Sequence, residues 1–276
     1  MASGNNADKL HDWIRSTARA GHDIPAILKM LADAGYPDRD SRRIVAKVLD
    51  RPAVALDTTV EATRVHAARH PPAPIADAGD RRVRVSASLD KPVVRVLDGL
   101  LDADECAGLI DAARPRLDRA TTVATDGSYQ VDQRRTSHGM FFKPAETPLV
   151  ARIEQRLAAL TGIPAENGEG LQILHYLPSQ QYEPHYDWFD PAQPGYSAIT
   201  RHGGQRIASI VMYLNTPLAG GGTAFPEVGF TVTALAGSAV YFAYHGGDKS
   251  SLHAGLPVID GEKWIATKWL RERPFR

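Results

Sequence analysis

The first fifty residues of the chain carry apolar positions at helical spacing. Leu10 and Ile14 begin one such set, and residues 24–31 and 44–48 carry two more, with glycine and proline between them. Residues three or four apart share one face of a helix, so each set forms an apolar face. The pattern predicts a small helical bundle over residues 1–50.

Residues 51–82 have no sustained apolar period. The stretch is rich in Ala, Pro, Arg and Thr, and it includes Pro71, Pro72 and Pro74. A segment of this composition cannot bury an apolar face of its own. We therefore expect a linker over residues 51–82 and a second domain over residues 83–276.

Short β-rich runs dominate the second half of the chain. Each run is rich in β-branched or aromatic residues and is bounded by Gly, Pro or Asn: residues 170–176, 206–214, 229–235, 237–242 and 264–270. Two helices precede them, one capped by Asp102 or Asp104 and the other capped by Thr147. Strands that follow one another without intervening helices favour an antiparallel sandwich or barrel. The predicted fold class is mainly β, with the two helices packed outside one sheet and a small N-terminal helical domain.

The charge balance argues against a polyanionic partner. The chain has 276 residues, with 32 Lys and Arg against 32 Asp and Glu, so no net field draws it to nucleic acid or to an anionic membrane. No apolar run approaches the roughly 20 residues of a membrane span, and no signal segment precedes the first helix. We expect a cytoplasmic protein that binds neither nucleic acid nor a membrane.

Because Cys106 is the only cysteine, metal ligands would have to be histidines and carboxylates.

Two side chains of the metal-ligand type stand close together in the segment Tyr-Glu-Pro-His-Tyr-Asp. In an extended strand residues i and i+2 point to the same face, so His185 and Asp187 present an imidazole and a carboxylate side by side. His253 is the best candidate for a third ligand, which would complete the 2-His-1-carboxylate set typical of non-haem Fe(II) oxygenases. A single His-x-Asp pair also occurs readily on a solvated edge strand. Its conjunction with a distant histidine and a β-rich core favours the metal site.

Several stretches of the second domain occur in an order and spacing typical of one enzyme family. They are Leu101-Asp-Ala-Asp-Glu-Cys, Arg134-Arg135-Thr-Ser, and residues 153–164, 176–189, 221–226 and 253–264. In these stretches the chain resembles the prolyl 4-hydroxylase family of Fe(II)- and 2-oxoglutarate-dependent dioxygenases. The resemblance covers about two thirds of the chain. It implies a double-stranded β-helix, the jelly-roll barrel, which agrees with the strand pattern.

The resemblance also implies roles for individual residues. The implied iron ligands are His185, Asp187 and His253, the implied co-substrate residues are Lys263, Tyr176 and Thr223, and the implied substrate residues are Arg135 and Tyr182. No catalytic side chain is implied beyond the metal centre. The implied cofactors are Fe(II), 2-oxoglutarate as co-substrate and O2, with ascorbate as reductant. A lysine inside a barrel is costly unless a counter-ion arrives, and a dicarboxylate supplies one to Lys263.

The expected function is therefore that of a dioxygenase which hydroxylates an unactivated C–H bond. The favoured substrate is a prolyl residue in a peptide or protein, as in a procollagen-proline 4-dioxygenase. Three alternatives stay open: a hydroxylase of a free amino acid or small metabolite, a catalytically silent barrel that binds proline-rich peptides, and a cupin-like metal protein without 2-oxoglutarate. Lys263 separates the last of these from the oxygenase. A homodimer is also left open.

Overall fold

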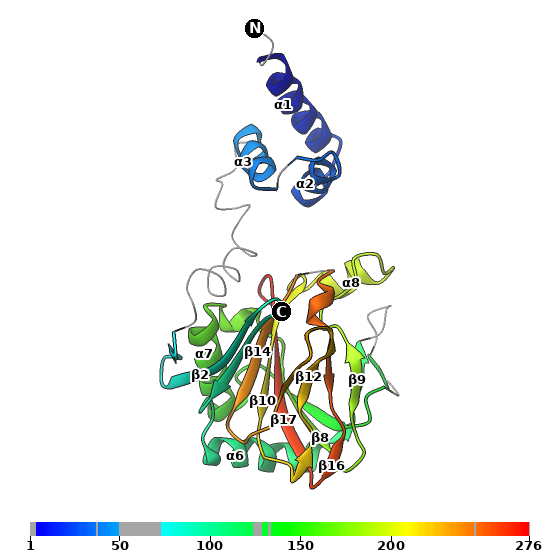
Figure 1. Ribbon diagram of the computed structural model, residues 1–276. Helices are drawn as coiled ribbons and strands as arrows, with labels where there is room; N and C mark the ends of the chain where they lie inside the picture. Colours follow the sequence, from blue (N-terminus) through cyan, green and yellow to red (C-terminus); the bar gives the residue numbers. More distant parts are fainter. Residues whose placement is uncertain are drawn as a thin grey trace. The chain divides into compact units, whose positions relative to one another are not determined.

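The chain folds into two compact units. The computed structural model describes residues 4–36, 38–49, 73–123, 129–131, 134–245 and 247–275. Contacts along the chain divide it into residues 1–62 and residues 63–276. Each unit is drawn in Figure 1, and each is described here by itself.

Within its described residues, the first unit contains three helices. These are α1 (Gly4–Arg19), α2 (Ile24–Asp33) and α3 (Asp38–Val48). Their apolar faces meet in a small core formed by Ile14, Ile27, Leu31, Val45 and Val48. Asp23 caps α2, because its carboxylate accepts a hydrogen bond of 2.9 Å from the backbone N–H of Ala26.

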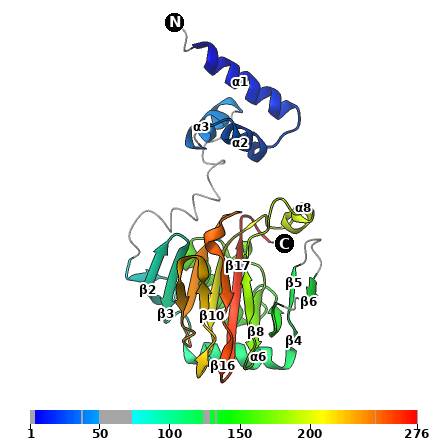
Figure 2. The same cartoon turned by 45° about the vertical axis from the view of Figure 1, so that its right-hand side comes forward.

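The second unit is built on a large antiparallel sheet that faces a smaller one (Figures 1 and 2). The large sheet has the order β1 (Ile75–Asp77), β2 (Arg82–Asp90), β3 (Val93–Asp98), β14 (Ala239–Ala243), β10 (Arg206–Tyr213), β17 (Lys263–Arg271), β8 (Leu171–Tyr176), β7 (His138–Phe142) and β4 (Asp118–Arg119). The small sheet has the order β13 (Phe230–Val232), β12 (Thr223–Phe225), β15 (His253–Gly255) and β9 (Tyr182–His185). Two further pairs join β11 (Ala219–Gly220) to β16 (Val258–Asp260) and β5 (Thr121–Val123) to β6 (Tyr129–Val131).

This arrangement confirms the predicted mainly-β jelly roll. From β8 onward, the chain passes repeatedly between the two sheets, so that most neighbours within each sheet are distant in sequence, the hairpin of β12 and β13 being an exception. The space between the sheets is filled by side chains such as Tyr176, Phe225 and Phe242. Successive residues of a strand point to opposite faces, so every second residue of β8, β14, β17 and the regular part of β10, from Ala208 onward, enters this space. The barrel interior is where the candidate site lies.

Two long helices cover the other face of the large sheet, as predicted. They are α6 (Ala103–Ala113) and α7 (Pro148–Thr161). Asp102 caps α6 in a reciprocal capping box with Glu105, and Thr147 caps α7. The shorter helices of this unit are α8 (Tyr196–Thr200), η1 (Arg114–Arg116), η2 (Ala165–Asn167), η3 (Pro226–Val228) and η4 (Lys249–Ser251).

The structure places the start of the second domain earlier than residue 83. Residues 75–77 form β1, which pairs with β2, and Ala78 is fully buried in the core. A strand of this length is too short to show an apolar period, which is why the linker was expected to extend to residue 82. Most of the expected linker, residues 50–72, lies outside the described residues.

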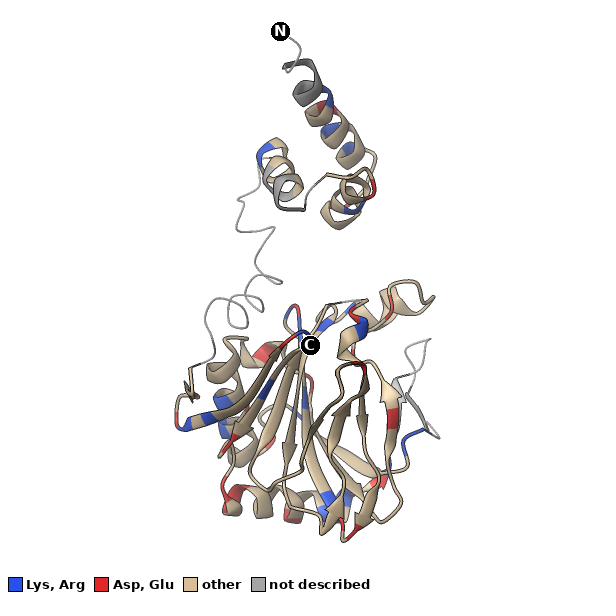
Figure 3. Cartoon of the chain, in the orientation of Figure 1, with Lys and Arg blue, Asp and Glu red and all other residues tan. Residues whose placement is uncertain are grey.

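Charges of both signs are interspersed over the helices and strands of the second unit (Figure 3).

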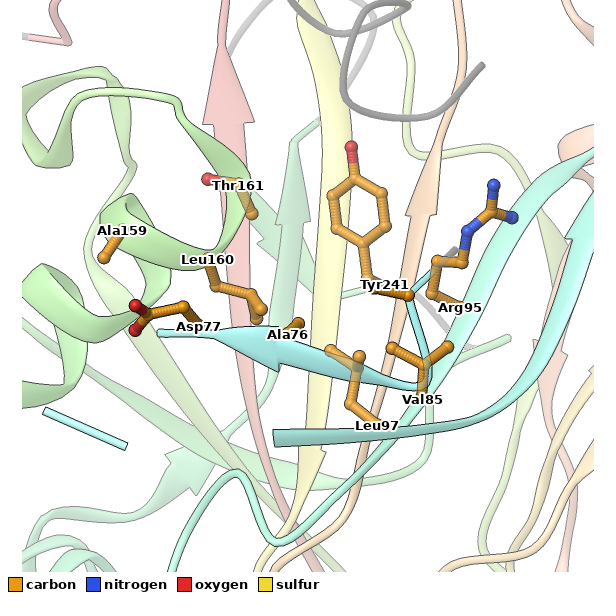
Figure 4. Close-up of a pocket in the computed structure, with 10 residues that line it drawn as sticks. Ala76, Asp77, Val85, Arg95, Leu97, Ala159, Leu160, Thr161 and Tyr241 are labelled. Carbon is orange, nitrogen blue, oxygen red and sulfur yellow. The ribbon is translucent and has the colours of Figure 1, made fainter. Parts of the chain in front are cut away.

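Between α7 and the strands β1, β2, β3 and β14 lies a cavity of about 310 Å³ (Figure 4). Apolar side chains such as Val85, Leu97 and Leu160 line it together with Arg95 and Tyr241. Because its apolar lining belongs to the helix-covered core, this cavity is separate from the barrel interior. None of the helices in the described parts of the chain combines the length and the apolar character that a membrane span requires.

Candidate active site

The two histidines and the aspartate predicted as metal ligands converge at one end of the small sheet. His185 ends β9, His253 begins β15, and these two residues are paired across the strands. Asp187 lies two residues beyond the end of β9. The ligand atoms of the three side chains all lie within 4.8 Å of one another. Asp187 Oδ1 is 3.7 Å from His185 Nε2, and Asp187 Oδ2 is 3.6 Å from His253 Nε2.

Backbone carbonyls orient both imidazoles toward the aspartate. Nδ1 of His185 lies 2.8 Å from the carbonyl oxygen of Glu183, and Nδ1 of His253 lies 3.0 Å from that of Ser251. A carbonyl oxygen can only accept, so Nδ1 carries the proton in each ring. Nε2 is then left with a free lone pair, which is the form that binds a metal.

Burial and charge favour the metal-binding protonation state of this cluster. Burial, reinforced by the neighbouring His253, lowers the pKa of His185 to about 3, so its ring is neutral at pH 7. Burial alone would raise the pKa of Asp187, but His253, His185 and Arg206 outweigh it and hold this pKa at about 2. A neutral imidazole and an ionised carboxylate are thus available together at neutral pH.

The donor set fits Fe(II). Two imidazole nitrogens and one carboxylate from one side of the site leave the remaining coordination positions open to co-substrate and oxygen. Aromatic rings surround the donors: Tyr182 stacks on His185 at 3.6 Å between ring centroids, and Phe242 lies 4.5 Å from His253. These rings exclude water from the side of the cluster that faces the core.

Lys263, at the start of β17, is buried inside the barrel without an acidic partner. The residue is 2% exposed, and within the described parts of the chain no carboxylate forms an ion pair with it. Its ammonium lies 4.3 Å above the ring of Tyr176, its cross-strand neighbour on β8. Burial, with a smaller contribution from Arg135, lowers the pKa of Lys263 to about 8. A buried cation in this state is a ready site for a carboxylate.

Thr223 presents a hydroxyl donor to the same interior. The residue lies on β12 and is buried. Its Oγ1 accepts a hydrogen bond of 2.7 Å from the hydroxyl of Tyr213. Since the lone pair is used in this way, the hydroxyl hydrogen of Thr223 is left for an acceptor such as a carboxylate.

Arg135 and Tyr182 lie together beside the metal-ligand cluster. The two residues form an isolated antiparallel bridge, and the guanidinium of Arg135 lies 4.9 Å from the centre of the Tyr182 ring. Arg135 is 4% exposed; one of its nitrogens donates to Gln172 at 3.0 Å, while its buried Nε has no hydrogen-bond partner in the described structure. An unpaired buried donor indicates a place for an acceptor supplied by a ligand.

Known proteins share both the sequence and the fold of the second unit. The profile of the 2OG-Fe(II) oxygenase superfamily matches residues 171–271. A probable prolyl 4-hydroxylase 10 of Arabidopsis thaliana is 38% identical over 210 residues, which cover 67% of this chain and 71% of that protein. The chain belongs to the prolyl 4-hydroxylase family.

Other prolyl 4-hydroxylases agree with this placement. The chain is 40% identical to prolyl 4-hydroxylase subunit alpha-1 of Bos taurus over 191 residues, which are 67% of this chain and 35% of that subunit. Among solved structures, the 2OG complex of a viral collagen prolyl hydroxylase from Paramecium bursaria Chlorella virus-1 is 30% identical with a TM-score of 0.51. That match covers 64% of this chain and 95% of the viral protein.

Membership of the prolyl 4-hydroxylase family confirms the predicted enzyme class and its main cofactors. The superfamily is that of the 2OG-Fe(II) oxygenases, so Fe(II), 2-oxoglutarate and O2 are the cofactors. The structure contributes a cluster suited to the metal and a buried lysine, without a carboxylate partner among the residues described, that is suited to the dicarboxylate. The assignment of individual residues to these ligands stays a prediction.

Further polar residues of this prolyl 4-hydroxylase-family site were missed in the sequence. Ser209 Oγ donates to Asp187 Oδ2 at 2.5 Å, and Tyr244 OH lies 2.8 Å from the same Ser209 oxygen. Arg206 pairs with the buried Glu169 and reaches the backbone oxygen of Asp187 at 3.4 Å. The available signal was Ser209 itself, which interrupts the otherwise apolar or aromatic run of residues 207–214.

Proposed function

We propose that the protein is a prolyl 4-hydroxylase that acts on a prolyl residue within a peptide or protein. The observation that carries the proposal is the convergence of His185, Asp187 and His253 in the barrel that also encloses Lys263, a buried lysine with no carboxylate partner among the described residues. The barrel would thus offer both a set of metal ligands and a counter-ion for a dicarboxylate. The named prolyl hydroxylases among its relatives support the choice of substrate.

Hydrogen bonds to the backbone position the two histidines among the candidate metal ligands. His185 and His253 would bind Fe(II) through Nε2, because their Nδ1 protons are held by backbone carbonyls. Asp187 would supply the third ligand as a carboxylate. When bound, Fe(II) supplies the redox chemistry that couples oxidation of 2-oxoglutarate to hydroxylation of the C–H bond.

Residues of the barrel interior would hold the co-substrate. Lys263 would pair with the distal carboxylate of 2-oxoglutarate, and the Thr223 hydroxyl would donate to the same group. The ring of Tyr176 fixes the lysine ammonium from one side. This arrangement sets the direction in which the dicarboxylate enters the barrel.

The substrate side of the site would involve Arg135 and Tyr182. The free Nε of Arg135 can donate to a backbone carbonyl of a bound peptide, and the Tyr182 ring offers an apolar face to a pyrrolidine ring. Both residues border the cluster through the Tyr182–His185 stack. Ascorbate would serve as the reductant that restores Fe(II) after turnover without substrate.

The test measures succinate release and peptide mass together. The protein is supplied with Fe(II), 2-oxoglutarate and ascorbate, with or without proline-rich peptides, and compared with His185→Ala and Lys263→Ala. We expect peptide-dependent succinate release and a peptide heavier by one oxygen atom, both lost in His185→Ala. His175→Ala is the matched control, because this histidine pairs with Glu262 instead of entering the cluster.

Other outcomes separate the alternatives. Oxygen transfer to free proline or another small molecule, with no change in any peptide, would replace the peptidyl substrate by a metabolite. Absence of succinate at every concentration of iron and co-substrate would support a silent binding barrel. Succinate release that persists in His185→Ala would reject the ligand assignment.

A further inference from the structure

The carboxylate of Asp187 is held by a chain of two hydroxyl groups that the family resemblance did not include. Ser209 lies on β10, is fully buried and points into the barrel. Its Oγ is 2.5 Å from Asp187 Oδ2 and 2.8 Å from the hydroxyl oxygen of Tyr244. Tyr244 directly follows β14 and is also buried.

The direction of both hydrogen bonds is fixed by elementary chemistry. An ionised carboxylate can only accept, so the single hydroxyl hydrogen of Ser209 is donated to Asp187. Ser209 then has only lone pairs left, and Tyr244 must donate to it. The chain therefore runs from Tyr244 through Ser209 to one oxygen of Asp187.

The other oxygen of this carboxylate is left for the metal. Asp187 Oδ1 lies 3.7 Å from His185 Nε2, and among the described residues it accepts no hydrogen bond. A metal ligand that is hydrogen-bonded through its second oxygen keeps one orientation and one mode of binding. We propose, on the basis of the proposed function, that Ser209 and Tyr244 form a relay that makes Asp187 bind Fe(II) through Oδ1 alone.

An irregularity of β10 makes the relay part of a larger support. The register of β10 against β17 shifts between Arg206 and Ala208, so β10 contains one extra residue there. In a regular strand residues three apart face opposite sides, but this bulge lets Arg206 and Ser209 both face the barrel interior. Arg206 reaches the backbone oxygen of Asp187 at 3.4 Å while Ser209 holds its side chain.

Arg206 and Tyr244, the two outer residues of this support, are each held by further contacts. Arg206 donates to both carboxylate oxygens of Glu169, at 2.6 and 2.8 Å, and its guanidinium lies 4.1 Å from the centre of the Trp269 ring. Tyr244 packs at 5.9 Å against Phe242, whose ring lies 4.5 Å from His253. Through Ser209 the relay contacts Asp187, and through Tyr244 and Phe242 it packs near His253, so it supports two of the three candidate ligands.

The test is a metal titration of the full-length protein without peptide. Fe(II) is titrated anaerobically, and Co(II) is used as a second probe because its absorption spectrum reports coordination number and geometry. We expect Ser209→Ala to weaken binding of both metals by about 10- to 100-fold, with a changed Co(II) spectrum. Tyr244→Phe should weaken binding several-fold, because it removes only the outer hydrogen bond, and Ser209→Thr should restore most of the affinity.

A double-mutant cycle separates a relay from independent packing effects. In a relay, Tyr244 acts only through Ser209, so Ser209→Ala with Tyr244→Phe should bind metal no more weakly than Ser209→Ala alone. Additive losses would overturn the proposal. Matched controls are Ser238→Ala, whose hydroxyl donates to the Leu235 carbonyl, and Tyr241→Phe, whose ring lies on the helix-covered side of β14. Both should leave metal affinity unchanged.

The remaining outcomes are also decisive. Wild-type metal affinity and an unchanged Co(II) spectrum in Ser209→Ala would reject the relay. If Ser209→Ala does not fold, Tyr244→Phe and Ser209→Thr decide, since unchanged binding in the first together with loss in the second contradicts the proposal. The titration needs no substrate, so a failed relay leaves prolyl hydroxylation standing, and a failed peptide assay leaves the metal result standing.

Discussion

Two buried lysines on one strand show how a single residue can be reserved for a ligand. Lys268 and Lys263 both lie on β17 and are almost fully buried, on opposite faces of the sheet. Lys268 forms an ion pair with Glu154 of α7, so its charge is neutralised within the fold. Lys263 has Tyr176 beneath it and no carboxylate partner in the described parts of the chain. The first lysine is structural, and the second is suited to a dicarboxylate that enters the barrel.

The unpaired lysine should reduce the stability of the ligand-free protein. Its pKa is about 8 in the fold against an ordinary 10.5, so between these values the unfolded chain binds a proton that the folded chain has released. The free energy of unfolding therefore rises with pH over this interval. Lys263→Met should raise the free energy of unfolding by on the order of 1–3 kcal/mol at pH 7. The difference in this free energy between the variant and the wild type should narrow from pH 8 upward.

The same substitution should weaken binding of 2-oxoglutarate by about 10- to 100-fold, because it removes a charged hydrogen-bond donor. Denaturant unfolding between pH 6 and 10 and calorimetric titration of the co-substrate measure the two effects. Lys29→Met is the control, since this exposed lysine pairs with Asp33 on α2. Equal stability of Lys263→Met and wild type at pH 7 would show that burial of the charge has no cost.

At the scale of single residues, the sequence predicted the cluster but not its supports. His185 and Asp187 were found from their spacing in an extended segment, and His253 was added from its residue type and from the family resemblance. Ser209 and Tyr244 carry no such signature, since serine and tyrosine are common in strands for many reasons. Their roles depend on hydrogen bonds between residues far apart in sequence, which only three-dimensional structure reveals.

At the scale of elements, strand irregularities place key side chains. The pairing of β15 with β9 shifts between His253 and Gly255, which pair with His185 and Tyr182. The extra residue on β9 allows Tyr182 and His185, three apart, to stack on each other at 3.6 Å. Apolar periodicity located β10 but neither β9 nor β15, and because it assumes a regular alternation it could not predict the bulges. Short strands such as β1 escaped it for a related reason, because a few residues cannot display a period.

The contact between α7 and β17 should depend strongly on its buried ion pair. Glu154→Ala leaves Lys268 buried without a counter-charge, and we expect the free energy of unfolding to fall by about 3–5 kcal/mol. Replacing both partners, as Glu154→Leu with Lys268→Met, should recover most of this loss. Chemical denaturation measures the set, and co-substrate affinity of the double variant checks that the barrel interior is intact. A loss below about 1 kcal/mol in Glu154→Ala would contradict this reading, because it is the size expected of an exposed pair.

At the scale of the whole molecule, the candidate site belongs to one of the two units. All residues proposed to bind metal, co-substrate or peptide lie between Arg135 and Lys263, within the unit of residues 63–276. The relatives match about two thirds of the chain, which agrees with this division. The sequence predicted two domains from the change in composition. Residues 1–50 carry no motif that points to a function, so the sequence predicted the helices of the first unit but not its role.

A chain that begins at Ala73 should keep the chemistry of the full-length protein. It retains β1, both covering helices and every candidate ligand. We expect metal affinity and peptide-independent succinate release within roughly twofold of the full-length values, since a domain carries its own core. Titration and succinate assays on the purified fragment measure this. Loss of metal binding in a fragment that unfolds cooperatively would show that the first unit contributes to the site.

Under the proposed function, the enclosed ammonium of Lys263, which has no carboxylate partner among the described residues, links the stability of the barrel to the supply of 2-oxoglutarate. A ligand that binds only folded chains stabilises them by RT ln(1 + [L]/Kd), about 2.7 kcal/mol at a hundredfold excess over Kd. Cells poor in 2-oxoglutarate would leave Lys263 uncompensated, and the chain would open more often to proteases. Under the proposed function, the abundance of the enzyme would then follow its metabolite, in addition to the rate at which each copy works.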